Sequence, residues 1–460
     1  MEYKEFLESK KHSAINFGFE PEYFNPNLFD FQRHIVNYAV KKGRCAIFLD
    51  TGLGKTLIEL TIALNYVKKT NKPVLIITPL AVANQFVIES EKFGIPEVEH
   101  TKNGKYTKKI ILINYERLHY LNSSDFDCVI LDESSILKNF DGAIKQQVTT
   151  FLKKVKYRFL ATATPSPNDY IELGTSSEAL GYLGYMDMLS RFFKNNQNNV
   201  SKLSQIAKAR QGEEWYLKPH AENDFWQWVS SWGISAKKPS DLGFKNDRFI
   251  LPKLHEIETI IRNENPLPIN GQTRLFSVAA IGFKEIKQEA RATIQQRCEI
   301  AVEKAAKHET SVYWCNLNDE ADALLELDKS AVEVRGNMDI DKKEDILLNF
   351  STGQIKKLVT KTSITAFGLN WQHCNHTTYF PTYSYEQYYQ AIRRFWRFGQ
   401  KRDVFVDLVL SDGQERIMQS LLVKKDKAIK MFEKLSEHTN ASYTIKQKEF
   451  NKKITLPKFL

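Results

Sequence analysis

The segment that most restricts the possible folds is CAIFLDTGLGKTLIEL, in which an apolar run leads through a glycine-rich turn into a helical pattern. The run Cys45–Leu49 is followed directly by Gly52, Gly54, Lys55 and Thr56. Glycines let a backbone turn tightly and direct its N–H groups at phosphate oxygens. The first turn of the following helix adds partial positive charge. A strand, a glycine turn and a helix in this order predict an α/β domain that binds phosphate.

The glycine turn gives each neighbouring residue a predicted role. The Lys55 ammonium would reach the β- and γ-phosphates of a nucleotide, and the Thr56 hydroxyl would bind Mg²⁺. Leu53 lies between the two glycines, so its backbone would face the same phosphates. The pattern departs from the strict GxxxxGK[ST] form because Leu49 occupies the first glycine position. An accidental glycine turn is the alternative interpretation.

A second segment, FDCVILDESSILKN, places two carboxylates at the end of an apolar strand. Ligands of open α/β sheets bind at the carboxyl ends of the strands. Asp132 suits a contact with Mg²⁺, directly or through water, and Glu133 is placed to polarise an attacking water. An exposed acidic turn is the alternative, but the glycine turn upstream argues against it. The sequence has no NKxD guanine signature, which favours ATP over GTP.

Short apolar runs alternate with helical patterns over most of the chain. They are Cys45–Leu49, Val74–Ile77, Ile110–Ile113, Cys128–Leu131 and Phe159–Ala161 in the first half, and Val312–Cys315, Val332–Val334, Thr377–Phe380 and Val404–Leu410 in the second. Such runs are typical of parallel strands that are covered on both faces. The predicted fold class is therefore α/β, with two doubly wound lobes built on parallel sheets.

Between the two lobes the pattern changes. From about Thr175 to Leu251 no strand–helix alternation is visible, and the segment is rich in aromatic residues: Tyr182, Tyr185, Trp215, Tyr216, Trp226, Trp228 and Trp232. We expect a mainly helical insertion whose rings form a core, with stacking on bases as the alternative. The predicted parts are an N-terminal extension (1–27), lobe 1 (28–174), the insertion (175–251), lobe 2 (252–412), and a C-terminal helix with a basic tail (413–460).

The C-terminal helix is predicted from one apolar face. Over Gln414–Leu435 this face carries Ile417, Leu421, Ala428, Phe432 and Leu435. The lysine-rich tail that follows is interpreted as a solvated end, with contact to phosphates as the alternative.

Composition restricts the partners and the compartment. A net charge of +10, from 65 basic and 55 acidic residues, favours a polyanionic partner such as nucleic acid, although a soluble protein of high pI is an equal alternative.

The five cysteines form no CxxC pair, and His373, Cys374 and His376 are the one hint of a metal site, which we do not expect. The charged N-terminus and the lack of long apolar runs argue against a signal peptide and a membrane helix. We expect a monomer in the cytoplasm of a prokaryote or of a viral host.

The segment DESSILKN resembles motif II of the Swi/Snf-type ATPases of helicase superfamily 2, usually DEAHxLKN, with Ser134 and Ser135 in place of Ala-His. Seven further segments resemble the family's other motifs in the family's order: LFDFQRHIVNYA, VLIITPLAVANQFVIESEKF, INYERL, RFLATATPSPNDYIEL, SVYWCNLNDEADAL, TKTSITAFGLNWQ and QAIRRFWRFGQ. The resemblance covers roughly Leu28 to Leu410 without the aromatic insertion. It implies two RecA-like lobes that bind ATP between them.

The resemblance also implies roles for individual residues. It puts Gln32 near the adenine. It implies contacts with a nucleic-acid strand for Thr78, Pro79, Gln85, Asn114, Tyr115, Asn316 and Thr362. It implies that Thr162 and Thr164 couple ATP to the strand. It implies further nucleotide contacts for Gly368 and Gln390.

The segment QAIRRFWRFGQ is similar to the family's arginine motif, Q-A-x-D-R-x-H-R-I-G-Q. Arg394 and Arg397 match it, whereas Arg393 stands where Asp is usual and Trp396 where His is usual. A guanidinium near the γ-phosphate neutralises charge that grows in the transition state, an effect worth roughly 10³–10⁵ in rate. Arg397 is our first choice for this catalytic arginine and Arg394 the second. A solvated basic helix face is the alternative.

The function implied by the resemblance is that of an ATP-hydrolysing motor that moves along double-stranded DNA. Closure of the two lobes around ATP would produce each step, and the contacts would be mostly to phosphates. Two alternatives remain: a helicase that separates DNA or RNA strands, and a nucleic-acid clamp that is gated by the nucleotide and turns over little.

Overall fold

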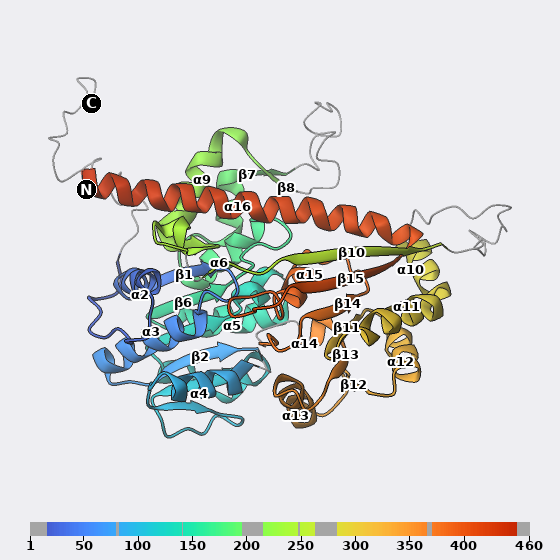
Figure 1. Cartoon of the computed structure of the whole chain (residues 1–460). Helices are drawn as coiled ribbons and strands as arrows, with labels where there is room; N and C mark the ends of the chain where they lie inside the picture. The colour runs from blue at the N-terminus through green and yellow to red at the C-terminus, as the bar shows by residue number, and fades with distance from the viewer. Residues whose placement is uncertain are drawn as a thin grey trace, which may run out of the picture. The chain divides into compact units, whose positions relative to one another are not determined.

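The computed structural model describes residues 16–79, 82–139, 141–195, 215–246, 249–262, 283–365 and 370–448. These residues form two compact units (Figure 1). Unit 1 takes in the described residues of Met1–Thr78, Glu89–Asn246 and Ala428–Leu460, and unit 2 those of Pro79–Ile88 and Asp247–Lys427. Each unit is built on its own parallel sheet, so the predicted α/β class with two parallel-sheet lobes is confirmed.

The sheet of unit 1 has the strand order β3-β4-β2-β5-β6-β1-β9, and all of these strands are parallel. The strands are β1 (Arg44–Leu49), β2 (Val74–Thr78), β3 (Val98–His100), β4 (Ile110–Asn114), β5 (Cys128–Asp132), β6 (Tyr157–Thr162) and β9 (Gly233–Ala236). Nearly every strand residue of β1, β2, β4, β5 and β6 is buried, as a parallel sheet covered on both faces requires. All five apolar runs predicted as strands in this half are confirmed.

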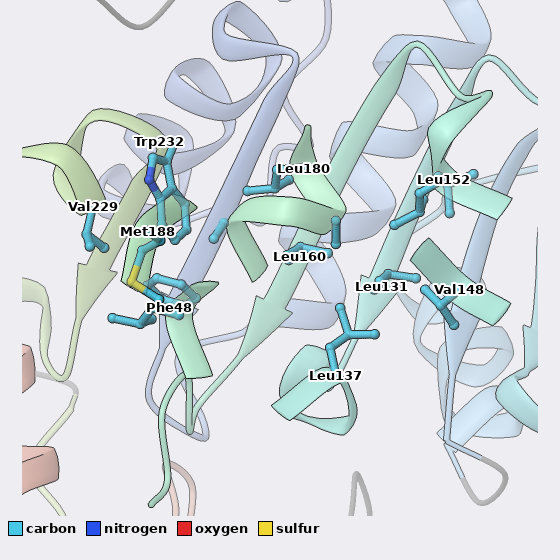
Figure 2. Close-up of a cluster of buried hydrophobic side chains, with 14 of the residues drawn as sticks. Phe48, Leu131, Leu137, Val148, Leu152, Leu160, Leu180, Met188, Val229 and Trp232 are labelled. Carbon is cyan, nitrogen blue, oxygen red and sulfur yellow. The ribbon is translucent and has the colours of Figure 1, made fainter. Parts of the chain in front are cut away.

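Helices cover both faces of this sheet. The helices of unit 1 are α2 (Asp30–Lys42), α3 (Lys55–Thr70), α5 (Ala143–Lys153), α6 (Leu173–Leu180), α7 (Tyr185–Phe192) and α9 (Glu222–Trp232), and α4 (Ala83–Lys92) has residues in both units. In β1, Ala46 and Phe48 belong to the hydrophobic cluster drawn in part in Figure 2. The alternate residues of β1 point to the other face. Helix α3 contacts β2, β4 and β5.

The aromatic region belongs to unit 1 and adds a strand to its sheet, which the sequence did not predict. β9 pairs with β1 in parallel, and β7 (Phe193–Asn195) pairs with β8 (Trp215–Leu217) in a separate antiparallel sheet. Trp226 and Trp232 are 1% and 0% exposed, and the Trp232 ring lies 6.1 Å from that of Phe48. Figure 2 shows Trp232 beside Phe48 and Met188. These rings therefore form core, the interpretation that the composition favoured, but they complete lobe 1 rather than a separate insertion.

The sheet of unit 2 has the strand order β10-β15-β14-β11-β13-β12, again with every pairing parallel. Its strands are β10 (Leu254–Ile261), β11 (Ser311–Cys315), β12 (Ala331–Val334), β13 (Lys357–Lys361), β14 (His376–Tyr379) and β15 (Val404–Ser411). Its helices are α10 (Phe283–Ala292), α11 (Ile294–Ala306), α12 (Asn318–Leu327), α13 (Ile340–Ser351), α14 (Thr362–Thr365) and α15 (Tyr385–Ile392). The four predicted strand runs are confirmed, and β10 and β13 are additional.

The last helix, α16 (Glu415–Lys448), has residues in both units. Ile417 and Leu421 are buried within unit 2, and Phe432 and Leu435 are buried within unit 1, so the predicted apolar face is confirmed. Among the described residues, no helix combines the length and the apolar character that crossing a bilayer requires.

Candidate active site

The turn between β1 and α3 depends on two glycines. Gly52 and Gly54 have φ values of 84° and 79°, in the left-handed region that side chains with a Cβ seldom adopt. A Cβ on Gly54 would also lie 2.3 Å from Nε2 of Gln32. The turn thus needs glycine at residue 54 for its backbone and for the close approach of a neighbouring side chain. No side chain caps the start of α3, whose N-cap is Gly54, and uncapped helix N-termini bind phosphate groups.

Gln32 holds this turn in place. Its Nε2 donates to the carbonyl oxygen of Leu53 at 2.9 Å, and its Oε1 accepts from the backbone N–H of Phe29 at 2.9 Å. The side chain is 3% exposed. Gln32 therefore links the start of α2 to the glycine turn. The sequence predicted that Gln32 lies near the adenine but did not predict this link.

Lys55 folds back over the turn from which it projects. Its Nζ donates to the carbonyl oxygens of Leu49 at 3.0 Å and Asp50 at 3.5 Å. Burial lowers the pKa of Lys55, and the nearby carboxylates, Glu133 first among them, oppose that shift. A phosphate is a stronger acceptor for an ammonium group than neutral carbonyls are. The lysine is thus placed to exchange these two carbonyls for phosphate oxygens.

Asp132 lies at the carboxyl end of β5 and is 6% exposed. The Thr78 hydroxyl donates to its Oδ2 at 3.1 Å, and the Tyr115 hydroxyl donates to its backbone carbonyl at 2.7 Å. Burial raises the pKa of Asp132 to about 7, with Glu133 adding to the rise and Lys55 opposing it. A cation at this site would favour the ionised carboxylate.

Glu133 is held in an unusual backbone conformation. Its φ of 54° and ψ of 53° are left-handed values that are rare outside glycine, and its side chain is 4% exposed. The Thr162 hydroxyl donates to Oε2 of Glu133 at 3.3 Å and accepts from the backbone N–H of Thr164 at 3.0 Å. The two threonines predicted to couple ATP to movement therefore lie directly behind this carboxylate.

Glu59 is a third carboxyl group beside this pair, and the sequence interpretation did not include it. It lies one helical turn after Lys55 in α3, is 0% exposed, and neither of its carboxyl oxygens has a hydrogen-bond partner among the described residues. Burial raises its pKa well above the usual value, Asp132 adds to the rise, and Lys55 opposes it. The sequence could have indicated Glu59, because it is a single acidic residue inside an otherwise apolar helical stretch.

The arginine motif of unit 2 follows α15. Arg394 is 2% exposed, and its guanidinium donates to the backbone oxygen of Gln390 at 3.0 Å and to its Oε1 at 2.7 Å. Arg393 lies over the rings of Trp396 at 5.0 Å and Tyr389 at 5.7 Å. Arg397 is half-buried. The two aromatic neighbours give Arg393, which stands where Asp is usual, a packing role.

Two family models match the two halves of the chain. The model described as DEAD/DEAH box helicase matches residues 29–173, and the model described as helicase conserved C-terminal domain matches residues 292–399. Together they cover more than half of the 460 residues. The chain belongs to the superfamily 2 helicases, and it is Swi/Snf-like.

Curated relatives of this helicase are similar over about a third of its length. DNA annealing helicase and endonuclease ZRANB3 of Bos taurus is 29% identical over 191 residues, which cover 37% of this chain and 18% of the relative. The SWI/SNF-related matrix-associated actin-dependent regulator of chromatin subfamily A-like protein 1 of Xenopus laevis is 32% identical over 165 residues, 34% of this chain and 17% of the relative. The matched region thus spans less than a fifth of each relative.

A solved structure described as "Sulfolobus solfataricus SWI2/SNF2 ATPase core in complex with dsDNA" is 18% identical to this helicase. The comparison gives a TM-score of 0.41 over 95% of this chain and 99% of that chain.

The residues predicted to contact a nucleic-acid strand fall into two groups, one buried and one more exposed. Thr78, Asn114, Tyr115 and Thr362 are at most 3% exposed. Asn114 Oδ1 lies 3.1 Å from Nε2 of His100, and the Thr362 hydroxyl donates to Gln387 at 3.1 Å. These four side chains are buried within their units, and their contact with a strand stays a prediction.

The remaining predicted strand contacts are more accessible. Asn316 is exposed, and Pro79 and Gln85 are partly exposed. Gly368, predicted to contact the nucleotide, lies outside the described residues. Gln390, predicted to do the same, is 0% exposed and bonded to Arg394.

Proposed function

We propose that this helicase hydrolyses ATP with Mg²⁺ and uses the energy to move along double-stranded DNA. The observation that carries the proposal is the arrangement at the start of α3. Lys55 rests on the carbonyls of its own glycine turn and interacts electrostatically with Asp132 and Glu133. A lysine, a glycine turn and two carboxylates are the groups that bind a triphosphate and a water molecule for phosphoryl transfer.

The donor set at this site fits a magnesium ion. Thr56 lies in the first turn of α3 and is partly exposed, and Asp132 ends β5. Oxygen ligands of this kind suit a small divalent cation. When bound, the ion would neutralise phosphate charge, and Thr56 and Asp132 would hold it.

The protein's own residues then divide the remaining work. Lys55 would bind the terminal phosphates, and Glu133, oriented by Thr162, would accept a proton from the attacking water. Unit 2 would supply the guanidinium that stabilises the transition state. Arg397 suits this role better than Arg394, because the buried Arg394 guanidinium already donates to Gln390 of α15.

Duplex DNA is the proposed track. The two curated relatives are named for DNA annealing and for chromatin regulation. The chain's net charge of +10 suits phosphate contacts, whose affinity falls steeply with salt. Such contacts do not depend on base sequence, as movement along a track requires.

The deciding experiment is a comparison of ATPase rates without nucleic acid, with duplex DNA, with single-stranded DNA and with RNA. We expect the greatest stimulation by duplex DNA. Stimulation by RNA alone would overturn the proposed track. A fork-unwinding assay under the same conditions separates translocation from strand separation, which the helicase family name also allows.

A further inference from the structure

Two arginines lie side by side at the amino ends of two strands in unit 1. Arg44 begins β1, Arg158 is the second residue of β6, and the register of these parallel strands places the two residues opposite each other. Arg158 is 6% exposed and Arg44 is half-buried. The carboxyl end of β1 leads to the glycine turn, so the arginines lie at the other edge of the sheet from Lys55.

The two guanidinium groups approach the same point beside Gly181, the C-cap of α6. A Cβ on Gly181 would lie 2.7 Å from Nη1 of Arg158 and 3.1 Å from Nη1 of Arg44. Gly181 is exposed to solvent and has a φ of 84°. Because glycine has no side chain, a small anion that approaches this residue from solvent can accept from both guanidiniums. We call Arg44, Arg158 and Gly181 the arginine cradle.

The positive charge of the arginine cradle is not balanced by a nearby carboxylate. Burial lowers the pKa of Arg158 to about 10, and the charge of Arg44 adds to this shift. Burial also lowers the pKa of Arg44, and Tyr182 is the group that opposes the shift. Within the part of the chain that the structure describes, no Asp or Glu contributes to either shift. An anion in the cradle would therefore relieve repulsion between two like charges.

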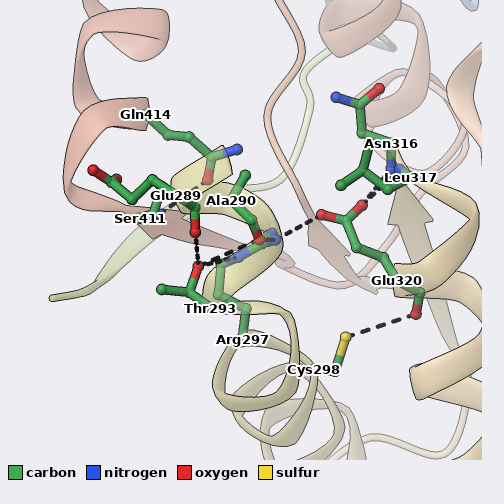
Figure 3. Close-up of polar contacts among 10 residues, drawn as sticks. All are labelled: Glu289, Ala290, Thr293, Arg297, Cys298, Asn316, Leu317, Glu320, Ser411 and Gln414. Atoms are coloured by element: carbon green, nitrogen blue, oxygen red, sulfur yellow. Dashed lines mark hydrogen bonds and ion pairs between the residues drawn. The ribbon is translucent and has the colours of Figure 1, made fainter. Parts of the chain in front are cut away.

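The buried Arg297 of unit 2 shows the usual way of compensating such a charge (Figure 3). Its guanidinium pairs with the Glu320 carboxylate at 2.8 Å, and both side chains are at most 1% exposed. Buried charges in proteins are normally paired in this way. Arg158 instead donates at 2.9 to 3.2 Å to three backbone carbonyls, those of Lys153, Val155 and Ala179. Carbonyl groups satisfy its hydrogen bonds but carry no net charge.

The two guanidiniums keep N–H groups for a ligand. Each guanidinium has five N–H donors. Arg158 uses three of them for carbonyls, and Arg44 donates from Nε to the carbonyl oxygen of Lys156 at 2.8 Å. Both Nη1 atoms at Gly181 can therefore donate once more. Three exposed lysines in the same segment add positive potential: Lys153, Lys154 and Lys156.

We propose that the arginine cradle binds one phosphate group beside Gly181. A phosphate with at most one ester bond carries up to two negative charges, which match the two guanidiniums, whereas a carboxylate carries one. Guanidinium groups also bind phosphate oxygens through paired, charge-assisted hydrogen bonds. The ligand is therefore inorganic phosphate or the phosphate at the end of a nucleic-acid strand. This site goes beyond the proposed ATPase activity and does not depend on it.

The test measures binding of radioactive inorganic phosphate to the full chain by equilibrium dialysis. Lys55→Ala is the reference protein, because the lysine of the glycine turn is itself expected to bind phosphate. In this background we expect one bound phosphate. Adding Arg44→Gln should weaken its binding roughly 10–100-fold, because charge-assisted hydrogen bonds are lost. Arg191→Gln removes an exposed arginine elsewhere in unit 1 and is the control, with unchanged affinity expected.

Gly181→Ala is a second test, because its methyl group would fill the space in front of both guanidiniums without changing any charge. We expect it to weaken phosphate binding at least as much as Arg44→Gln does. Gly243→Ala is the matched control. Gly243 is also in unit 1 and has a φ of 81°, but an added Cβ would meet no atom within 4 Å. This control has the same backbone strain and should bind phosphate like the reference protein.

Competition identifies the source of the phosphate. An oligonucleotide with a 5′-phosphate and the same oligonucleotide without it are compared with unlabelled inorganic phosphate as competitors. If the phosphorylated strand displaces the label at lower concentrations than inorganic phosphate does, the strand end is the ligand; otherwise the ligand is free phosphate. Equal displacement by the two oligonucleotides would overturn the proposal, and so would unchanged phosphate affinity in Arg44→Gln and Gly181→Ala.

Discussion

Glu133 shows how one residue can be aimed at a reaction by the structure around it. Its left-handed backbone has a strain cost of about 1–3 kcal/mol. The Tyr115 hydroxyl holds the carbonyl of the preceding Asp132, and the Thr162 hydroxyl contacts the carboxylate itself. Glu133 is buried, and its strained backbone is held from two sides. Such strain is characteristic of functional sites, where it fixes the direction of a side chain at a cost in stability.

Glu133→Gln should separate hydrolysis from binding. Glutamine keeps the size of the side chain but cannot accept the proton, so we expect kcat to fall by about 10²–10⁴-fold. ATP affinity should stay close to that of the wild type because the glycine turn and Lys55 are unchanged. Steady-state ATPase assays and equilibrium binding of a fluorescent ATP analogue measure the two effects. Lys55→Ala is the companion variant and should lose binding; hydrolysis by Glu133→Gln within tenfold of wild type would exclude the proposed base.

At the same scale, motif spacing predicted one site for Lys55, Asp132 and Glu133, and the charges of these three residues do interact in the structure. It did not identify the orientation of Thr78, whose hydroxyl points to Asp132 rather than to a surface. It also missed Glu59, because an acidic residue in an amphipathic helix is normally solvated. Burial of Glu59 follows from α3 being covered on every side near its start, which only the packed fold determines.

At the scale of elements, most of the strands that the sequence predicted are buried on both faces in the sheet. β5 reads CVILD with every residue buried, so its apolar run was visible in the sequence. β10 (LHEIETII) carries polar residues and is largely exposed, and β13 begins and ends with lysine. β9 is a four-residue strand, GISA, that is too short to form an apolar run. It is recognised as a strand only because it pairs with β1 in the structure. Pairing partners lie far away in sequence, so local periodicity cannot reveal them.

Helix α16 offers a prediction about its packing in unit 1. Leu435 is 0% exposed within the cluster that contains the unit 1 core, and Leu422, on the same helix, is 52% exposed. Leu435→Ala should lower the free energy of unfolding by about 2–5 kcal/mol, through lost burial and the cavity left behind. Leu422→Ala should change it by less than about 0.5 kcal/mol. Urea denaturation followed by circular dichroism measures both, and equal effects would show that α16 does not pack as described.

The histidine pair at the start of β14 predicts a dependence of stability on pH. His308 stacks on His376 with ring centroids 4.0 Å apart. Burial, then the charge of His376, lowers the pKa of His308 to about 4 from 6.5. The folded state therefore binds fewer protons than the unfolded state between these values. The stability that the neutral ring contributes is complete above pH 6.5 and is lost as the pH falls towards 4.

Substituting His308 tests this dependence. His308→Phe keeps a ring on His376 but removes the titrating group. We expect its melting temperature to fall less than that of the wild type between pH 7 and pH 5, with a difference of about 2–4 °C. Thermal denaturation at several pH values measures this difference. If the melting temperatures of the two proteins changed with pH in the same way, the lowered pKa of His308 would be contradicted.

At the scale of the whole molecule, the proposed mechanism needs groups from both units. Lys55, Asp132 and Glu133 belong to unit 1, and the arginines that follow α15 belong to unit 2. The buried Arg394 is committed to Gln390, whereas Arg397 is partly exposed. A requirement for both units would make hydrolysis depend on the conformation of the whole chain, which is how a motor couples chemistry to movement.

Arg397→Ala tests that dependence. Removing a guanidinium that acts in the transition state should lower kcat by roughly 10³-fold or more. ATP binding and the melting temperature should stay near those of the wild type. Arg394→Ala should instead lower the melting temperature, because it removes a buried side chain bonded to Gln390. Arg402→Ala removes an exposed arginine from the same region and should match the wild type in rate and stability. Rates are measured under single turnover with saturating duplex DNA, and a folded Arg397→Ala protein with the wild-type rate would mean that another group neutralises the transition state.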